Sequence, residues 1–514
     1  MAPESITFDA PYIVGYDPST ANKTGEWSIL TPRRGNRVSP CSLDCLLDGE
    51  VPSWLEAMKL EKWEEAWQIM KRANPFPAIT GYVCFHPCTE NCNRGQLDEP
   101  IAIPEVEKAI GLWRLENYQQ RPRYVSGKGK IAVVGSGPAG LSCAFYLTEA
   151  GYDVTVFECD KQPGGMLNLC IPEYRLPRKI LQKEIDVLQE EGITFVCDCR
   201  VGSDIKLQEL YKDYERVFLA TGSWLSRRLS IKGEDQPGVW TALDFLSTVN
   251  RGDKPDLEEP VFIIGGGNAA VDSARMALRL DGVKQVSLFY RRSRLEMPAE
   301  QVEVEAAVKE GVELNFNEVP CEIKSEQGKI KTVVFAYSRT NRQGLHIDQT
   351  RIFHRQCGTV IMALGQKADY SMFENMKDYQ RFFAGGDLVS GPSTVAEAIK
   401  AGRIAALSIT ADLEGLTGPT MHKVETAAVA FEELNLAVGT YFQPLGKQLS
   451  PIDEADRCLG CGTCTSCGIC YLFCPDLAVR IVDGRCEFDL DYCKGCGICE
   501  KECPSRALVM EGGR

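Results

Sequence analysis

Hydrophobic positions in the first quarter of the chain recur with a helical period. Residues 51–73 are rich in helix formers and place Trp63 and Trp67 four positions apart, on one face. Such a stripe is typical of a helix that packs against a core. The sequence therefore predicts a helical N-terminal domain, which we assign to residues 1–125.

Further along, short hydrophobic runs alternate with amphipathic ones. A strand–helix–strand pattern begins at Ile131, and a second begins near Val261. Residues 286–365 predict mainly strands, and a glycine-rich turn is then followed by a helix-like run that ends near Leu413. This alternation predicts a multidomain α/β protein with two Rossmann-like domains. The first comprises residues 126–250 and 375–415, and the second comprises residues 251–374.

Length and charge narrow the class of protein. The chain has 514 residues, which suggests three or four domains. Its formal charge of −14 argues against nucleic acid or an anionic membrane surface as a partner. It has no apolar run of about 18 residues, and its start lacks the basic and apolar regions of a signal peptide. We therefore expect neither a membrane span nor export.

Cysteine is the most informative residue type, with 23 copies against four histidines. Most of the cysteines lie between residues 41 and 92 or between residues 458 and 503. Small secreted proteins use many cysteines as disulfides, whereas regular spacing in a large chain is typical of metal ligands. The expected location is the reducing cytoplasm.

The tail contains two copies of one cysteine motif, each followed by proline. Two residues separate the first three cysteines of each copy, and three residues precede the fourth. This is the spacing of bacterial ferredoxins with two [4Fe–4S] clusters, in which the fourth cysteine ligates the other cluster. Residues 451–514, after a linker at 416–450, are therefore predicted to form a ferredoxin-like α+β domain. The two ligand sets are Cys464, Cys467, Cys470 and Cys503, and Cys493, Cys496, Cys499 and Cys474.

Two structural zinc sites are the alternative, but two full copies with the proline favour iron–sulfur clusters. Cys458 and Cys461 extend the spacing upstream. If the first motif began three positions earlier, at Cys461, its fourth cysteine would have to stand at Tyr471. The motif that begins at Cys464 is therefore preferred. Cys458 and Cys461 are left as spare thiols or as ligands to another group.

Two glycine motifs predict nucleotide sites. In the first, Gly135, Gly137 and Gly140 join a hydrophobic strand to a helix, and the next strand ends at Glu158. The glycines let the backbone approach a pyrophosphate, and the carboxylate suits a ribose hydroxyl. This site is expected to bind FAD.

The second motif has Gly265, Gly267 and Ala270 in the same positions. Its second strand ends in Arg291 and Arg292 rather than in an acid. Arginine there suits a 2′-phosphate, so the site is expected to take a nicotinamide nucleotide, with NADPH favoured over NADH. A solvated strand end is the alternative for the two arginines.

A third segment follows at residues 382–406. Gly386 and Asp387 form a turn from which a carboxylate can hold a polyol hydroxyl, and the following helix start offers N–H groups. With the two glycine motifs, it fits a second contact surface for FAD.

Residues 38–415 resemble the small (beta) subunit of NADPH-dependent glutamate synthase and its relatives, which include the bifurcating ferredoxin:NADP oxidoreductase large subunit and the reductase half of dihydropyrimidine dehydrogenase. The strings that carry the resemblance are GYVCFHPC, GSGPAGL, GGMLNLCIPEYRLP, ATGS, GGGNAAVDSAR, YRRSRLEMPA and AGGDLVSGPSTVAEAIKAGR. The resemblance implies further nucleotide contacts at Pro138, Ala139, Gly164, Gly165, Met166, Arg175, Gly222, Asn268, Thr394 and Val395.

The N-terminal cysteines depart from the pattern of these relatives. The relatives begin with a CxxC pair ahead of CxxxC, and only Cys41 and Cys45 remain here. We therefore expect one N-terminal [4Fe–4S] cluster, held by Cys45, Cys84 and Cys88. Its fourth ligand is left open among Cys41, Cys92 and Glu107, and a metal-free group of packed cysteines is the alternative. Cys170, where relatives have glycine, is expected to be a buried spectator.

Together these features predict an NAD(P)H-dependent FAD and iron–sulfur oxidoreductase. The cofactors carry the chemistry, so no catalytic side chain is assigned. We expect the chain to be an electron-transfer subunit that serves a larger oxidoreductase or a ferredoxin, without contact to nucleic acid or membrane. A self-contained reductase of a small molecule and a non-enzymatic iron–sulfur relay are the alternatives.

Overall fold

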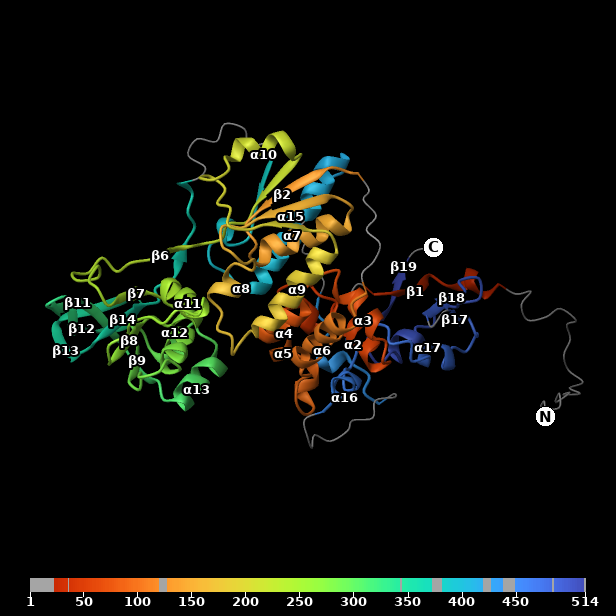
Figure 1. Ribbon diagram of the computed structural model, residues 1–514. Coiled ribbons are helices and arrows are strands. Elements are labelled where there is room, and N and C mark those ends of the chain that lie inside the picture. The colour runs from red at the N-terminus through yellow and green to blue at the C-terminus, as the bar shows by residue number, and fades with distance from the viewer. Residues whose placement is uncertain are drawn as a thin grey trace, which may run out of the picture.

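The computed structural model describes residues 23–35, 37–119, 127–342, 344–371, 381–418, 427–437, 449–482 and 485–512. Much of the predicted linker at 416–450 and several of the predicted domain limits therefore lie outside the described residues. Figure 1 shows two α/β units, with a helical region and a C-terminal module beside them. The architecture confirms the predicted fold class of Rossmann-like domains with flanking iron–sulfur domains.

The first α/β unit is built on a five-stranded parallel sheet of order β16–β5–β2–β3–β4. The strands are β2 (Lys130–Val134), β3 (Asp153–Phe157), β4 (Thr194–Val196), β5 (Arg216–Leu219) and β16 (Phe382–Ala384). The helices are α7 (Pro138–Glu149), α8 (Met166–Leu169), α9 (Arg178–Glu190), α10 (Leu207–Asp213), α14 (Asp387–Ser390) and α15 (Val395–Glu414). Helices α7 and α15 pack together, although about 250 residues separate them in sequence.

The second α/β unit repeats this plan with the strand order β10–β9–β8–β14–β7. The strands are β7 (Val239–Thr241), β8 (Val261–Ile264), β9 (Val286–Tyr290), β10 (Glu313–Phe316) and β14 (Thr359–Met362). The helices are α11 (Ala242–Asn250), α12 (Asn268–Leu278) and α13 (Gln301–Glu310). A three-stranded antiparallel sheet of β11 (Glu318–Glu326), β12 (Lys329–Asn341) and β13 (Gly344–Gln356) completes the unit. The short pair β6 (Leu225–Ser226) and β15 (Gln366–Lys367) joins the two units.

The N-terminal region is helical. Its helices are α1 (Pro40–Leu43), α2 (Val51–Lys59), α3 (Trp63–Met70), α4 (Pro77–Val83), α5 (Pro87–Glu90) and α6 (Ile103–Glu116). The run 51–73 forms two helices rather than one, because Glu61 adopts a left-handed backbone with φ of +55° and the chain turns there. Trp67 is buried, and Trp63 stacks on Trp113 with ring centroids 6.0 Å apart.

The C-terminal module contains α17 (Ile469–Leu472), α18 (Ile498–Lys501), β17 (Val479–Val482), β18 (Arg485–Phe488) and β19 (Leu508–Gly512). Strand β1 (Leu30–Arg34), from the start of the chain, pairs antiparallel with β19 (Figure 1). Helix α16 (Pro451–Asp456) packs on α2 and α6 of the N-terminal region instead of on the module. The two ends of the chain are therefore interleaved, which the predicted domain limits do not anticipate. Among the described residues, no helix is long and apolar enough to cross a membrane.

Candidate functional site: two nucleotide sites and three groups of cysteines

The first glycine motif forms the turn between β2 and α7. Gly135 has φ of +99°, and a Cβ there would lie 2.5 Å from the carbonyl oxygen of Ala220. A Cβ at Gly140 would collide with the carbonyl oxygen of Gly135. At Gly137, by contrast, a Cβ would meet no atom within 4 Å. The first and third glycines are thus required by the fold, whereas the second leaves space at the start of α7, ahead of Pro138, where a pyrophosphate fits.

Glu158 follows β3 and is buried beside this turn. Its Oε2 accepts hydrogen bonds from the backbone N–H, at 3.0 Å, and the hydroxyl of Ser136. The Ser136 Oγ in turn accepts from the N–H of Gly164 at 2.9 Å. A Cβ at Gly165 would lie 2.8 Å from Gly137 Cα, so the GGM segment before Met166 closes over the glycine turn. The carboxylate is thereby fixed at the end of the strand where the motif predicts it.

The third segment meets the same turn. A Cβ at Gly386 would lie 2.8 Å from Cβ of Ala139, in the first turn of α7. Asp387 Oδ1 accepts hydrogen bonds from the N–H and the Oγ of Ser393, at 3.1 and 2.5 Å. Burial raises the pKa of the Asp387 carboxyl above its ordinary value, although the Ser393 hydrogen bonds oppose the rise. Thr394 caps α15, which begins at Val395. The structure thus brings both predicted FAD segments together.

The second glycine motif has the same geometry between β8 and α12. A Cβ at Gly265 would collide with the carbonyl oxygen of Ala363, whereas a Cβ at Gly267 would meet no atom within 4 Å. Asn268 opens α12, and its Oδ1 accepts the N–H of Glu300 at 2.9 Å. Ala270 is fully buried against the sheet. The open position is again the middle glycine, at the N-terminus of an 11-residue helix.

Arg291 and Arg292 follow β9, beside this helix start. Arg291 is exposed, and its carbonyl oxygen accepts the Ser338 hydroxyl at 2.7 Å, which fixes its backbone. Arg292 is half-buried, and its Nε lies 4.0 Å from the Glu296 carboxylate. The Arg291 guanidinium is therefore the freer of the two cations at the strand end.

Arg175 forms an ion pair between the two units. Its Nη1 lies 2.8 Å from Oδ2 of Asp272, on α12 of the second unit. The guanidinium groups of Arg275 and Arg279 stack over the ring of the adjacent Tyr174, with their Cζ atoms 4.5 and 4.1 Å from the ring centroid. This segment therefore joins the two nucleotide-binding units. Gly222 has φ of +74° in the loop after β5.

Cys170 precedes this segment. Burial raises the pKa of its thiol to about 12. A thiol held protonated in this way is a poor nucleophile.

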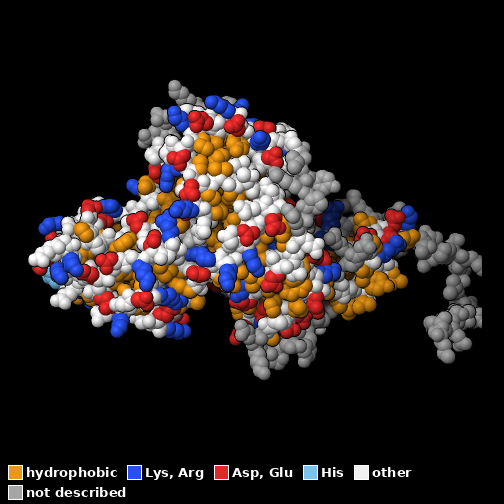
Figure 2. All heavy atoms as spheres, viewed as in Figure 1, with side chains coloured by type: hydrophobic (Ala, Val, Ile, Leu, Met, Phe, Trp, Pro, Cys, Tyr) orange, Lys and Arg blue, Asp and Glu red, His pale blue; other side chains and the backbone are white. Residues whose placement is uncertain are grey.

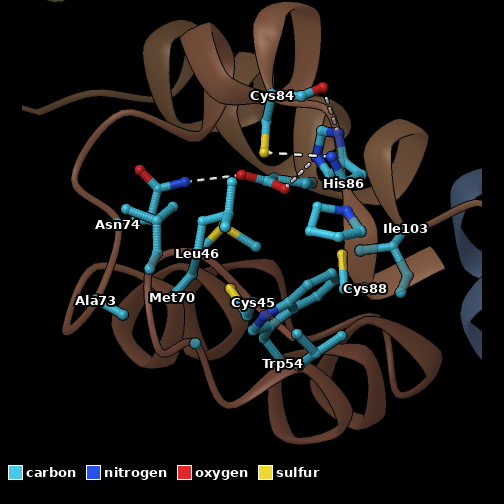
Figure 3. A pocket seen from close by; sticks show the side chains of 15 residues that line it. Cys45, Leu46, Trp54, Met70, Ala73, Asn74, Cys84, His86, Cys88 and Ile103 are labelled. Atoms are coloured by element: carbon cyan, nitrogen blue, oxygen red, sulfur yellow. Dashed lines mark hydrogen bonds and ion pairs between the residues drawn. The ribbon is translucent and has the colours of Figure 1, made fainter. Parts of the chain in front are cut away.

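Three N-terminal cysteines surround one cavity. Figure 3 shows Cys45, Cys84 and Cys88 around it, from three different segments of the helical region. Glu107 of α6 also lines this cavity, whereas the residues that line it do not include Cys41 or Cys92. Of the three candidates for a fourth ligand, the structure brings only Glu107 to the three thiols.

Glu107 is held by a network that the sequence analysis did not anticipate. Its Oε1 accepts from Asn74 Nδ2 at 2.7 Å and from the Thr80 hydroxyl, and its Oε2 lies 2.8 Å from Nε2 of His86. Burial lowers the pKa of His86, but the Glu107 carboxylate outweighs this and raises it above the ordinary value. His86 stands inside the CFHPC string, so that string was the signal that marked it.

The thiols of this cavity are chemically suited to a cluster. Burial, reinforced by Glu107, raises the pKa of Cys84 to about 12, and burial also raises that of Cys45. Buried thiols of this kind become ligands when cationic iron compensates their thiolate charge. Cys84 Sγ also accepts the backbone N–H of His86 at 3.4 Å, a type of hydrogen bond that tunes Fe–S sites. The donor set therefore fits a [4Fe–4S] cluster.

The C-terminal module gathers its thiols in two groups. One cavity is lined by all four members of the second predicted set, Cys474, Cys493, Cys496 and Cys499. In the first set, Cys470 and Cys503 are buried in one core with Cys464 beside them. Cys467 is exposed. Cys486, which has no ligand spacing, lies with its Sγ 3.1 Å from that of Cys470. The cavity thus joins Cys474 of the first motif to the three cysteines of the second, and Cys486 adds one sulfur beside Cys470.

Comparison with known proteins identifies the class. Residues 129–402 match the family model described as pyridine nucleotide-disulphide oxidoreductase. Residues 36–119 match dihydropyrimidine dehydrogenase domain II, 4Fe-4S cluster, and residues 486–509 match the 4Fe-4S binding domain. Because the first match covers more than half of the chain, the chain belongs to the pyridine nucleotide-disulphide oxidoreductase family. These matches confirm the predicted class of FAD and iron–sulfur oxidoreductase and its predicted set of cofactors.

Two relatives and one solved structure are informative. The NADP(+)-dependent formate dehydrogenase subunit beta of Moorella thermoacetica is 36% identical over 436 residues, covering 75% of this chain and 61% of that protein. The NADPH-Fe(3+) oxidoreductase subunit beta of Geobacter sulfurreducens is 34% identical over 349 residues, covering 65% and 52%. The chain thus spans less than two thirds of either relative. FprA of Mycobacterium tuberculosis (a His57Gln mutant) shares the fold, at 18% identity and a TM-score of 0.50 over 56% of this chain and 85% of that one.

Proposed function

We propose that this chain is the electron-transfer subunit of a larger oxidoreductase and passes electrons between NADPH, FAD, [4Fe–4S] clusters and a catalytic partner subunit. The observation that carries the proposal is the position of the N-terminal thiol site. Cys45 and Cys84 pack against the core of the flavin unit, whereas Cys88 belongs to the core that also contains Ala455 and Cys458 of the C-terminal segment. A cluster held there lies between the flavin and the ferredoxin-like module.

The flavin side of this path is fixed by polar contacts. Arg403 of α15 donates to the carbonyl oxygen of Leu47 at 3.0 Å, and Lys400 lies 2.7 Å from Asp48. Both contacts hold the loop after Cys45 on α15, the helix that begins at the FAD surface. This contact supports an electron path from the flavin to the N-terminal cluster.

The residues of the chain bind and orient, and the cofactors react. When bound, FAD exchanges a hydride with the nicotinamide and single electrons with iron–sulfur clusters. Gly137 and Gly267 leave room for the two pyrophosphates, and the N–H groups at the starts of α7 and α12 hold them. Arg291, exposed at the end of β9, is positioned to pair with a 2′-phosphate, which supports NADPH as the preferred coenzyme.

For the N-terminal cluster we assign the ligands Cys45, Cys84, Cys88 and Glu107. The assignment rests on the four side chains lining one cavity. The hydrogen bonds of Glu107 to Asn74, Thr80 and His86 hold its carboxylate in place, as outer partners do for other ligating carboxylates.

An apolar surface on the C-terminal module supports a protein partner. Figure 2 shows hydrophobic side chains gathered over this module. Leu472 and Leu477 are 70% and 75% exposed, and Phe473 and Tyr471 are 50% and 43% exposed. These residues flank the cluster ligand Cys474. An exposed apolar patch beside a redox centre is suited to a catalytic subunit that takes up electrons. The subunit-beta names of both relatives agree with this role.

Anaerobic affinity purification from the native cell tests this proposal. The wild-type chain is expected to retain one catalytic oxidoreductase subunit that is reduced when NADPH is added. Leu472→Asp, on the apolar surface, should lose that subunit and its reduction. Leu295→Asp, at a side chain 98% exposed on the nicotinamide unit, should retain both. Equal recovery with both variants, or no reducible subunit with the wild type, would contradict the proposal.

We also propose a reducing compartment, the cytoplasm, as the place of action. All 23 cysteines, each within the described part of the chain, are free thiols. Free thiols near cluster sites are typical of proteins that work under reducing conditions.

A further inference from the structure

Cys41, Cys92, Cys458 and Cys461 are four thiols that the ligand sets above do not use. Their neighbours in sequence hold them together. Asn93, next to Cys92, donates its Nδ2–H to Sγ of Cys461 at 3.4 Å. Arg94 donates from Nη1 to the carbonyl oxygen of Arg457, next to Cys458, at 3.0 Å. Two segments about 365 residues apart are thus joined at the positions of their cysteines.

The segment that contains Cys41 contacts the same two segments. The N–H of Val429 donates to the carbonyl oxygen of Val38 at 3.0 Å, and Asn93 Nδ2 donates to the carbonyl oxygen of Val429 at 2.9 Å. A Cβ at Gly462 would lie 2.6 Å from the carbonyl oxygen of Arg37, so the loop after Cys461 lies directly on this segment. All four cysteines are therefore carried by segments in mutual contact.

The four thiols face an enclosed environment. Cys41 and Cys461 are 7% and 8% exposed, and Cys92 and Cys458 pack on the same apolar core as Cys41. Burial raises the pKa of Cys41 to about 12, with Cys92 and Cys461 close enough to add to the rise. Burial likewise raises that of Cys458, with additions from Cys41, Cys461 and Cys92. The hydrogen bonds of Asn93 and Arg94 and the shared burial bring the four cysteines into one region.

From this convergence we propose a second [4Fe–4S] cluster in the N-terminal region, ligated by Cys41, Cys92, Cys458 and Cys461. Cys458 and Cys461 supply, from the C-terminal segment, the CxxC pair that the start of the chain lacks. Gly460 between them has φ of +63°, and its N–H donates to Sγ of Cys458 at 3.4 Å. A tight loop with N–H···S contacts is typical of thiolates that hold a cluster.

A cluster fits these thiols better than a single zinc ion. Among the described residues, no three His, Cys, Asp or Glu side chains are close enough together to hold one metal ion. The same holds for the two ferredoxin sets, whose spacing belongs to iron–sulfur clusters. Four irons spread the thiolates further apart than one zinc ion at about 2.3 Å from each sulfur.

The segment of Cys458 is built firmly into the N-terminal region. Glu454 Oε1 accepts the N–H of Ala102 at 2.8 Å, and Arg457 contacts Asp98 at 3.0 Å. Arg94, only 2% exposed, also pairs with Asp98. The proposed cluster therefore adds covalent ligation to contacts that already hold the segment of Cys458 on the N-terminal region.

The position of the site makes it a relay. Cys41 lies in α1 and Cys45 just after it, and Cys88 lies in α5 and Cys92 just after it, so each of these two segments gives one thiol to each N-terminal site. On the other side, the N–H of Gly462 donates to the carbonyl oxygen of Ser505 at 2.6 Å, two residues after the cluster ligand Cys503. The site thus lies between the flavin-proximal cluster and the first ferredoxin cluster, and each electron it takes from one side leaves on the other.

The inference deepens the proposed function, and counting iron tests it separately from that function. The full chain, purified anaerobically, is expected to hold about sixteen irons and sixteen acid-labile sulfides, four for each of four clusters. Cys458→Ser/Cys461→Ser should hold about twelve of each. The control Cys321→Ser, at a half-buried thiol on β11 that lines neither cysteine cavity, should keep the wild-type content.

Native mass spectrometry of the wild type keeps the proposal testable if the double variant fails to fold. A mass increment of four clusters is expected, whereas three clusters, or three clusters and one zinc ion, would overturn the proposal. Full iron in a folded double variant would also overturn it. NADPH should still bleach the flavin in the double variant while the ferredoxin clusters lose their fast reduction. If NADPH fails to bleach the flavin even in the wild type, the proposed function fails while the iron count still decides the site.

Discussion

The guanidinium of Arg175 lies 2.8 Å from the carboxylate of Asp272 and joins the flavin unit to the nicotinamide unit. Both side chains are about nine-tenths buried. Burial raises the pKa of Asp272 to about 6, while Arg175 lowers it from what burial alone would produce. The pair therefore holds the two units together most strongly when Asp272 is charged.

Arg175→Ala is expected to lower the melting temperature more at pH 8 than at pH 5. The folded-state pKa of Asp272 is raised above its unfolded value near 3.9, so Asp272 destabilises the fold as pH rises through this window. Removing Arg175 raises that pKa further, so at pH 8 the variant must either keep the carboxyl protonated or bury an unpaired charge, at a cost of about 3 kcal/mol, whereas at pH 5 the carboxyl is protonated in both proteins. Thermal unfolding at both pH values measures the effect, with Arg175→Lys as the control. An equal loss at both pH values would contradict this account of the pair.

Gly267→Val should abolish reduction of the flavin by NADPH while FAD stays bound. A Cβ at Gly267 meets no protein atom, so the side chain fits the fold but occupies the space of the pyrophosphate. Gly137→Val should instead lose FAD. Gly418→Val, at another position with open space, serves as the control. Flavin absorbance before and after anaerobic addition of NADPH measures both outcomes, and normal bleaching in Gly267→Val would refute the second nucleotide site.

Arg291→Ala should raise KM for NADPH by about tenfold or more, the effect of losing one charge-assisted phosphate contact, and should change KM for NADH little. Arg294→Ala, three residues further along and also exposed, is the matched control. Steady-state reduction of an artificial acceptor with each coenzyme gives the two constants. A parallel rise for both coenzymes would show that Arg291 does not select the 2′-phosphate.

Glu107→Ala should cost about four irons per chain, because the N-terminal cluster loses its carboxylate ligand. Glu105→Ala, on the exposed side of the same helix, should keep them. Iron analysis and low-temperature electron paramagnetic resonance of the reduced protein measure the loss. Unchanged iron and an unchanged spectrum in Glu107→Ala would show that another side chain completes the site.

The nucleotide and ferredoxin elements were predictable because their signals are local. Gly135, Gly137 and Gly140 act within one turn, and the cysteines of each tail motif lie within eleven residues. The tail pairing of Cys474 with Cys493 was also predictable, because the crossing of ligands is a property of the motif itself.

The remaining features depend on contacts between distant segments. No spacing rule connects Cys41 with Cys461. The sequence around β1 likewise contains no signal that predicts its pairing with β19. The sequence leaves Glu107 as one of three candidates, and only the packing of α6 places it at one cavity with Cys45 and Cys84. The ion pair of Arg175 with Asp272 on α12 likewise joins two segments about 100 residues apart. Such pairings arise from tertiary packing, which a single sequence does not display.

The most direct test of the central claim is an anaerobic titration of the isolated chain with NADPH and, separately, with NADH, followed by flavin and iron–sulfur absorbance. The account predicts that NADPH bleaches both chromophores rapidly and that NADH does so more weakly. If neither coenzyme bleaches either chromophore, although FAD and iron are both present, the proposed path from nicotinamide through flavin to the clusters is wrong.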